Sequence, residues 1–173
     1  MAKENSSIEN NSIIEVTGLW KIFGHNPRRI IMSDLRNASR NEIREKTGNV
    51  LAVRNVSFQV QKGELFVVMG LSGSGKSTLI RCLLRLNEPT AGDIIVEGEN
   101  VSLYNEKELR ALRRNKIAMV FQHFGLLPHQ TVLDNVAYGL RIRGVKKKER
   151  YLLAKEAITK VGLDGWEKYL PAL

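Results

Sequence analysis

Cysteine, histidine and long apolar runs are all scarce in this 173-residue sequence. The one cysteine, Cys82, cannot form an internal disulfide framework, which is typical of a protein of the reducing cytosol, and its apolar sequence neighbours indicate a thiol in the core. No segment approaches the ~20 apolar residues of a membrane-spanning helix, and the polar start lacks the apolar part of an export signal. We therefore expect a soluble chain that is not exported.

The three histidines, His25, His123 and His129, are not spaced as metal ligands, either among themselves or with the cysteine. The sequence therefore does not predict a zinc-type site. It also lacks a strand in which aromatic and basic residues alternate, the pattern typical of several RNA-binding folds. We therefore expect no specific nucleic-acid partner.

Positive charge, in contrast, is abundant: the formal net charge at pH 7 is +9. One concentration of it lies between residues 141 and 150, where the basic residues are Arg141, Arg143, Lys146, Lys147, Lys148 and Arg150. Two interpretations stay open. The segment is either a solvated helix face, which we favour, or a surface held against a membrane protein and acidic lipid.

The most informative segment is Gly70–Thr78, which reads GLSGSGKST and matches the phosphate-loop pattern G-x-x-x-x-G-K-[ST]. It follows an apolar run at 65–69 and precedes a stretch compatible with a helix, which is the context that this motif requires. Glycines at three of its positions allow the backbone to turn its N–H groups toward a phosphate. The sequence therefore predicts a nucleotide-binding loop formed by Gly70, Leu71, Ser72, Gly73, Ser74, Gly75, Lys76, Ser77 and Thr78.

The chemistry of this loop assigns separate roles to its last residues. Loop amides and the N-terminus of the following helix face the phosphates, and Lys76 reaches the terminal phosphates as a point charge. The hydroxyl of Ser77 is the expected ligand of Mg²⁺. The predicted cofactors are therefore ATP and Mg²⁺.

Apolar patterns predict an α/β fold with two kinds of strand. The runs at 65–69 and 117–121, with helices between them, indicate buried strands of a parallel core sheet. Strands at 13–19, 53–60 and 94–96 indicate an antiparallel part beside it, since the second of these alternates apolar and polar residues. We expect a disordered tail at 1–12, followed by one partial domain at 13–173 that contains an insertion at 24–50.

Helix boundaries are predicted from capping patterns and apolar spacing. Ser39 with Glu42 in the insertion, and Thr131 with Asp134 farther on, each form a pattern that starts a helix. Further helices are expected at 76–86, 106–114 and 146–161. The last one carries a single apolar face and stops at Gly162; its face consists of Tyr151, Ala154, Ile158 and Val161.

Hydrolysis of a nucleotide requires a second acidic metal ligand, which normally ends a buried strand. The candidates after the phosphate loop are Glu97, Asp134 and Asp164. Glu97 ends a short strand beside a turn, Asp134 is better explained as a helix cap, and Asp164 follows a helix stop. The sequence therefore does not identify a second acidic metal ligand.

From the phosphate loop onward the chain resembles the ATP-binding subunits of ABC transporters. The matching segments are the loop itself, EPTAGD at 88–93, IAMVFQHFGLLPH at 117–129 and TVLDNV at 131–136. The resemblance implies that Gln122 begins the family's Q-loop, in which the glutamine contacts Mg²⁺ and the attacking water. Segment 122–162 then holds the Q-loop and the start of the helical subdomain. By resemblance, Lys76 and Gln122 are the catalytic candidates and Ser77 and Gln122 the Mg²⁺ ligands.

Within that family the chain is similar to glycine betaine and proline betaine importers, which insert a long segment before the strand that feeds the phosphate loop. The likeness lies in LWKIFG at 19–24 and in the insertion ending EKTG at 45–48. It implies that Phe23 stacks on adenine, although a lone phenylalanine would more often be a core residue. The fold class that we expect is therefore a P-loop NTPase of the ABC type.

The chain stops at YLPAL, where the family's signature sequence would begin. The resemblance thus implies an N-terminal part of a cytoplasmic ATPase at the inner face of the plasma membrane, which powers uptake of a quaternary-ammonium osmolyte. Its expected partners are a permease, a second ATPase copy placed head to tail and, indirectly, a substrate-binding protein. We expect the chain as given not to hydrolyse ATP. The alternatives are an ABC-type ATPase acting on nucleic acid or the ribosome, and a phosphate-loop kinase outside this family.

Overall fold

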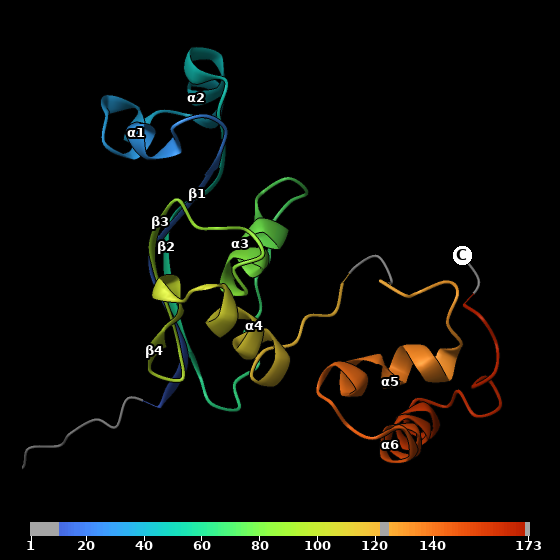
Figure 1. Ribbon diagram of the computed structural model, residues 1–173. Coiled ribbons are helices and arrows are strands. Elements are labelled where there is room, and N and C mark those ends of the chain that lie inside the picture. Colours follow the sequence, from blue (N-terminus) through green and yellow to red (C-terminus); the bar gives the residue numbers. More distant parts are fainter. Residues whose placement is uncertain (1–10, 122–124, 172–173) are drawn as a thin grey trace, which may run out of the picture. The chain divides into compact units, whose positions relative to one another are not determined.

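The computed structural model describes residues 11–121 and 125–171, and the chain divides into two compact units between Arg110 and Ala111 (Figure 1). The expected Q-loop residue, Gln122, lies outside the described residues, as does most of the expected N-terminal tail. The first unit contains the sheet and the phosphate loop, and the second is helical. The described residues include no helix with the length and apolar character needed to cross a bilayer.

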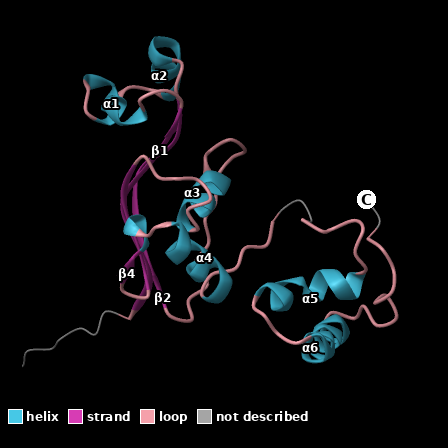
Figure 2. Cartoon of the chain, viewed as in Figure 1, coloured by secondary structure: helices cyan, strands magenta, loops and turns pink. Residues whose placement is uncertain are grey.

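A four-stranded antiparallel sheet forms the centre of the first unit (Figure 2). Its order is β2-β1-β3-β4, with bounds Ser12–Phe23 for β1, Val50–Gln61 for β2, Ala91–Val96 for β3 and Glu99–Asn100 for β4. The antiparallel strands predicted from the sequence are confirmed, although β1 and β2 are longer than expected. Gly92 lies so close to β1 that a Cβ there would be 2.4 Å from the Gly18 carbonyl oxygen, which explains a glycine in this strand.

The insertion folds into a small helical cap over one end of β1 and β2. It contains α1 (Pro27–Ile31), a 3₁₀ turn (Asp34–Asn37) and α2 (Arg40–Thr47). Ser39 Oγ accepts a 3.1 Å hydrogen bond from the Glu42 amide, so the predicted helix start is confirmed. The apolar residues of these helices share one core with the two strands, formed by Trp20, Ile22, Ile30, Ile43 and Leu51. Burial of these side chains fixes the insertion on the sheet.

Two more helices belong to the middle of the chain, α3 (Lys76–Leu83) and α4 (Glu106–Asn115). The turn between α3 and β3 is held by Arg85, whose guanidinium donates to the Glu88 carboxylate at 2.7 and 3.0 Å. The same guanidinium donates to the carbonyls of Val101 and Tyr104 at 2.9 and 2.8 Å. One arginine therefore links the end of α3 to the segment after β4.

The second unit is a helical pair, α5 (Val132–Ile142) and α6 (Lys147–Lys160). Thr131 Oγ1 accepts from the Asp134 amide at 3.1 Å, as the capping pattern predicts. Ala154 and Ile158 of α6 are buried, as expected of its apolar face. Val161 is not part of that face: it is 68% exposed, because α6 ends at Lys160 and the backbone leaves the helical direction there.

The expectation of two buried parallel strands is wrong for the described residues. Segment 65–69 and segment 117–121 form no strand, and the side chains of Leu65, Met69 and Val120 are at least 87% exposed. A parallel strand is stable when strands pair along its edges and other elements cover both of its faces. Neither segment pairs with another strand in the part of the chain that the structure describes, and although the Phe66 ring stacks on Phe58, most of their residues stay exposed.

A candidate phosphate-binding site

The loop before α3 has the backbone of a phosphate cradle. Gly70, Gly73 and Gly75 all adopt positive φ, at 156°, 74° and 103°. At Gly75 a side chain is sterically excluded as well, because a Cβ would lie 2.2 Å from the carbonyl oxygen of Ala52 in β2. The loop therefore needs glycine here both for its backbone angle and for its close approach to the strand.

Lys76 is the first residue of α3 and folds back over the loop. Its ammonium donates to the carbonyls of Gly70 at 2.6 Å and Leu71 at 2.8 Å, and more weakly to Ser74 Oγ at 3.4 Å. The Ser74 amide donates to the Leu71 carbonyl at 3.2 Å and closes the turn. The positive charge thus lies among the loop's own peptide groups, where an anion would meet both the charge and the helix N-terminus.

The first turn of α3 contains no acidic residue, so nothing there opposes the approach of a phosphate. Ser77 follows the lysine in this turn and is exposed, so its hydroxyl is accessible to a metal ion. Farther along the same helix, Cys82 is fully buried, and burial raises the pKa of its thiol to about 11. The expectation that Cys82 is a core thiol is confirmed.

A residue that the sequence analysis did not identify contacts the same loop from outside. Arg40, the first residue of α2, donates to the carbonyls of Gly73 at 3.3 Å and Ser74 at 3.0 Å, and to the Ala52 carbonyl of β2 at 3.3 Å. No local sequence pattern could reveal this contact, since 33 residues separate Arg40 from Gly73. The packing of the insertion brings them together.

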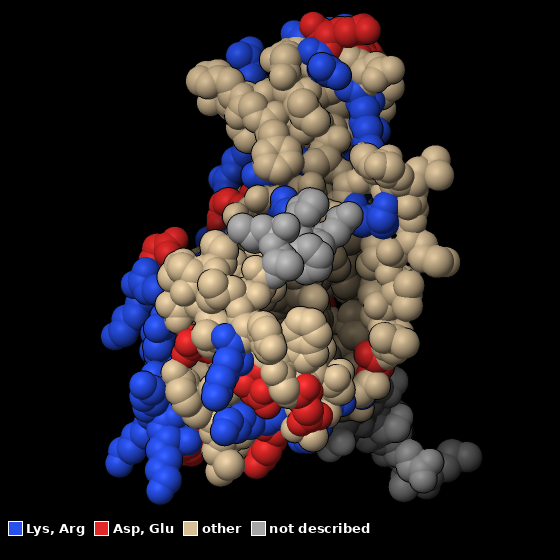
Figure 3. Space-filling view, turned by 90° about the vertical axis from the view of Figure 1, so that its right-hand side faces the viewer, with Lys and Arg blue, Asp and Glu red and all other residues tan. Residues whose placement is uncertain are grey.

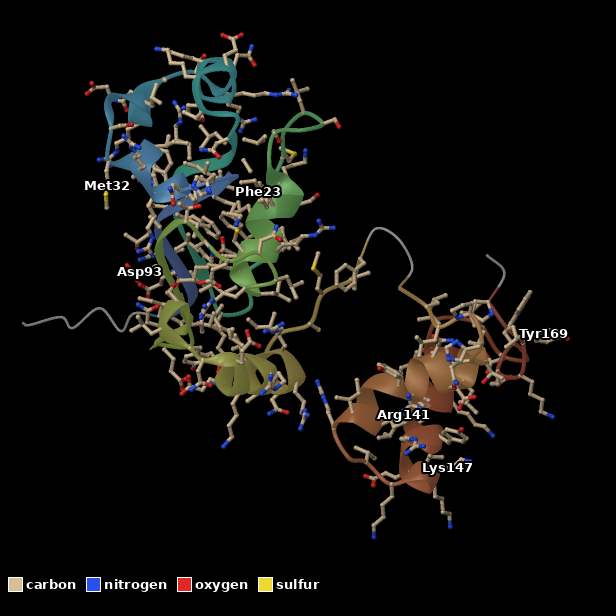
Figure 4. The ribbon with its side chains drawn as sticks, turned by 45° about the horizontal axis from the view of Figure 1, so that its top comes forward. Phe23, Met32, Asp93, Arg141, Lys147 and Tyr169 are labelled. Carbon is tan, nitrogen blue, oxygen red and sulfur yellow. The ribbon has the colours of Figure 1, made fainter. Side chains whose placement is uncertain are left out.

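Phe23 ends β1, and its side chain is 40% exposed (Figure 4). The interpretation of Phe23 as a core residue is therefore excluded. Its ring is covered on one side by the ammonium of Lys21, 4.5 Å from the ring centroid. The exposed ring has surface available for a flat ligand, and its stacking on adenine stays a prediction.

The described part of the loop after Gln122 is held by a single side chain of α5. Asn135 Oδ1 accepts from the Leu127 amide at 2.8 Å, and its Nδ2 donates to the carbonyls of Leu127, Gln130 and Thr131 at 3.0 to 3.1 Å. The sequence analysis missed this residue as well. The available signal is an asparagine near a helix start, a residue type that often bonds to neighbouring backbone.

The acids weighed as a second metal ligand have local structural roles or sit in a turn. Asp134 accepts hydrogen bonds from the hydroxyl groups of Tyr151 at 2.5 Å and Thr131 at 2.8 Å. Both bonds lower the pKa of Asp134, and the bond from Tyr151 has the larger effect. Asp164 accepts from Thr159 Oγ1 at 2.6 Å, and Glu97 has the positive φ of a tight turn. The described residues contain no group of three His, Cys, Asp or Glu residues placed to hold a metal ion.

Basic residues of the second unit lie at its surface. The Arg141 guanidinium carbon lies 4.8 Å from the centroid of the Tyr138 ring, and the Lys147 ammonium lies 5.4 Å from that of Tyr151. Figure 4 labels both cations, and Figure 3 shows lysine and arginine side chains at the surface of the face that it draws. These contacts agree with the solvated helix face that we favour.

Comparison with known proteins adds to this geometry. The family model described as ABC transporter matches residues 53–171. The chain is 46% identical over 158 residues to the glycine betaine/proline betaine transport system ATP-binding protein ProV of Salmonella typhimurium, and 50% identical over 159 residues to the trimethylamine N-oxide transport system ATP-binding protein TmoW of Ruegeria pomeroyi. These alignments cover 91% and 92% of this chain but only 40% and 46% of the relatives.

Among solved structures, a dimeric ATP-binding cassette in a post-hydrolysis state, bound to ADP and phosphate, is similar with a TM-score of 0.73. The alignment covers 91% of this chain and 61% of that one, at 26% identity. The predicted fold class is thus confirmed. The family match over more than half of the chain, together with these relatives, shows that the chain belongs to the ABC transporter family.

Proposed function

We propose that this chain binds Mg-ATP through Gly70–Thr78 and is the nucleotide-binding part of an ATPase that energises import of a quaternary-ammonium osmolyte. The observation that carries the proposal is the loop itself: three of its glycines have positive φ, and the ammonium of Lys76 bonds to its carbonyls at the N-terminus of α3. This donor set suits a polyphosphate, because backbone amides, a helix N-terminus and a cation converge on one small volume.

Within this proposal each residue has a separate task. Lys76 exchanges its carbonyl contacts for the terminal phosphates, Ser77 supplies a hydroxyl ligand for Mg²⁺, and Phe23 stacks on the adenine ring. Gln122, outside the described residues, would be the second contact to Mg²⁺. The metal ion, when bound, neutralises phosphate charge; the chain's own groups bind and orient the nucleotide.

Hydrolysis is assigned to the complete protein and not to these residues alone. Asp134 and Asp164 already accept local hydrogen bonds, and Glu97, which follows β3, lies in a tight turn at positive φ. We therefore propose that the chain as given binds ATP and turns it over negligibly. Multiple-turnover ATPase activity of the purified chain, abolished by Lys76→Ala, would contradict this.

The proposed partners follow from the relatives and from the solved neighbour. ProV and TmoW are named as ATP-binding proteins of transport systems, and the similar cassette is described as a dimer. We propose a membrane permease, a second copy in head-to-tail contact and, indirectly, a substrate-binding protein, with the ATPase peripheral on the inner face of the cytoplasmic membrane. Co-purification with the permease, and not with RNA, would separate this proposal from an ATPase acting on nucleic acid.

The decisive experiment is titration of the full-length gene product with Mg-ATP, as wild type, Lys76→Ala and the control Lys62→Ala. Lys62 is an exposed lysine in a turn of the same unit. Loss of one charge-assisted contact of about 1.5 to 3 kcal/mol predicts a ten- to hundredfold weaker affinity for Lys76→Ala. Lys62→Ala should bind as wild type does. Equal affinities of all three proteins would refute the assignment of the loop.

Uptake of radiolabelled glycine betaine tests the solute. Cells that carry the intact transporter should accumulate it with the wild-type ATPase and with Lys62→Ala, but not with Lys76→Ala. Uptake that is absent with the wild type, while Mg-ATP still binds, would leave the ATPase proposal standing and overturn the osmolyte.

A further inference from the structure

The contact between Arg40 and the phosphate loop is not explained by the loop's own sequence motif. Arg40 comes from the insertion, whereas the general family model matches only from residue 53 onward. Its guanidinium reaches two consecutive carbonyls of the loop, those of Gly73 and Ser74, and a third one in β2. A planar fork with several donors can hold such a set, whereas a lysine ammonium is a point charge on a flexible stem.

Because of the geometry of the peptide bond, this contact also sets the direction in which two of the loop amides point. In a trans peptide the carbonyl and the following N–H point in opposite directions. Because the Gly73 and Ser74 carbonyls point toward the guanidinium of Arg40, the amides of Ser74 and Gly75 must point away from it. The Ser74 amide donates to the Leu71 carbonyl at 3.2 Å and so closes a turn within the loop, as this direction requires.

The third contact anchors the loop to the sheet. Arg40 donates to the Ala52 carbonyl, the same oxygen that a Cβ on Gly75 would approach to 2.2 Å. Strand β2 and the loop therefore meet at one place, and the guanidinium bridges them. A loop tied to a strand has fewer conformations to lose when a ligand binds.

Helix α2, which carries Arg40, is capped at both ends and packed against the core. Its N-cap is Ser39, its C-cap is Gly48 at φ 70°, and Ile43 is fully buried in the core shared with β1 and β2. The position of Arg40 is thus fixed by packing that lies outside the phosphate loop.

We propose that Arg40 is a positioning residue for nucleotide binding, through which the insertion sets the amides of the phosphate loop. This inference rests on the proposed function of the loop. Because loop amides hold phosphates shared by ATP and ADP, loss of Arg40 should weaken both nucleotides by the same factor.

The experiment compares Arg40→Ala with two matched controls in the full-length gene product. Arg44→Ala removes the same charge from an exposed position on the same helix, and Ser39→Ala weakens the helix cap without touching the guanidinium. We expect Arg40→Ala to raise the dissociation constants of Mg-ATP and Mg-ADP about three- to tenfold, a range reduced for the exposure of the contact. Arg40→Lys should lie between wild type and Arg40→Ala, and each control within about twofold of wild type.

Amide hydrogen exchange without nucleotide gives a second readout that does not depend on binding. Arg40→Ala should speed exchange in segment 70–75 while segment 41–47 exchanges as in wild type. Unchanged loop exchange with unchanged affinity, or the same defect in Ser39→Ala, would overturn the positioning role. A wild type that does not bind nucleotide would overturn the proposed function instead, and the exchange data would still decide whether Arg40 orders the loop.

Discussion

Two loops of this chain are each contacted by a side chain from the start of the helix that follows, but the chemistry of these two side chains differs. In segment 70–75 the lysine at the first position of α3 donates to two carbonyls, and Arg40 holds two more from outside. In segment 125–131 the neutral amide of Asn135 makes four contacts, one with the Leu127 amide and three with backbone carbonyls. A loop held by cations keeps a positive charge that an anion can use, whereas a loop held by an amide is fixed in shape and electrically neutral.

The comparison suggests that the first loop is arranged for a ligand and the second for its own conformation. Substitutions should therefore separate the two. Changes in the first loop should alter nucleotide affinity, and changes around the second should alter the stability of the helical unit.

The largest effect is expected for Gly75→Ala. The new Cβ would lie 2.2 Å from the Ala52 carbonyl in a residue at φ 103°, so loop and strand must separate. Strain of this kind costs about 1 to 3 kcal/mol before the steric overlap is added, and Mg-ATP binding should be lost. Gly73→Ala is the matched control, because its Cβ would meet nothing within 4 Å and only its backbone angle is strained. Chemical unfolding and ATP titration measure both; equal effects at the two positions would refute the close approach at Gly75.

Asn135→Ala should destabilise the helical unit by about 1 to 3 kcal/mol, since it leaves the Leu127 amide without its acceptor. The loss should appear even though alanine is the better helix former. ATP affinity should stay at the wild-type value. Glu156→Ala, at an exposed position of α6, is the control for unfolding. Unchanged stability of Asn135→Ala would mean that the loop does not depend on this amide.

Phe23→Ala should weaken ATP binding several-fold, because stacking of an aromatic pair contributes about 0.5 to 1.5 kcal/mol beyond the buried area. Phe23→Trp should bind ATP as well as the wild type, since it keeps a flat ring. Isothermal titration with ATP measures the difference, and a melting curve serves as the control. If the melting temperature collapses while affinity is kept, the stacking role is wrong.

The smallest effect is a pH dependence of the helical unit. The pKa of Asp134 is lowered in the folded state, first by the hydrogen bond from Tyr151 and then by that from Thr131. The carboxylate therefore contributes to the free energy of unfolding at a pH above its unfolded pKa near 3.8. This contribution is lost as pH falls through the folded pKa. The bond to Asp134 raises the pKa of the Tyr151 phenol. The protonated phenol therefore contributes to the free energy of unfolding below pH 10, and this contribution is lost as pH rises through the folded pKa.

Unfolding free energies measured across the pH range should therefore decline at both ends. Asp134→Asn should flatten the acid side, and Tyr151→Phe should reduce both slopes because the shared bond is removed. Identical pH profiles of the variants and the wild type would show that this pair does not couple to folding.

The sequence by itself determined the features that depend on neighbours along the chain. Residues 70–78, the caps at Ser39 and Thr131, the antiparallel strands and the core position of Cys82 all follow from residue types within a few positions of one another. Backbone angle, cap hydrogen bonds and strand alternation are local properties, and the structure confirms the two caps, the antiparallel strands and the buried thiol, whereas nucleotide binding by residues 70–78 stays a prediction.

Only the tertiary structure decided which distant groups meet. It pairs Arg40 with the phosphate loop, exposes Phe23 at the end of β1 and leaves 65–69 and 117–121 without partner strands. The prediction of strands in these two segments was wrong. An apolar run indicates that a segment prefers burial, but it does not identify the element that will cover the segment. A strand forms when its N–H and C=O groups find partners, and those partners are supplied by other parts of the fold.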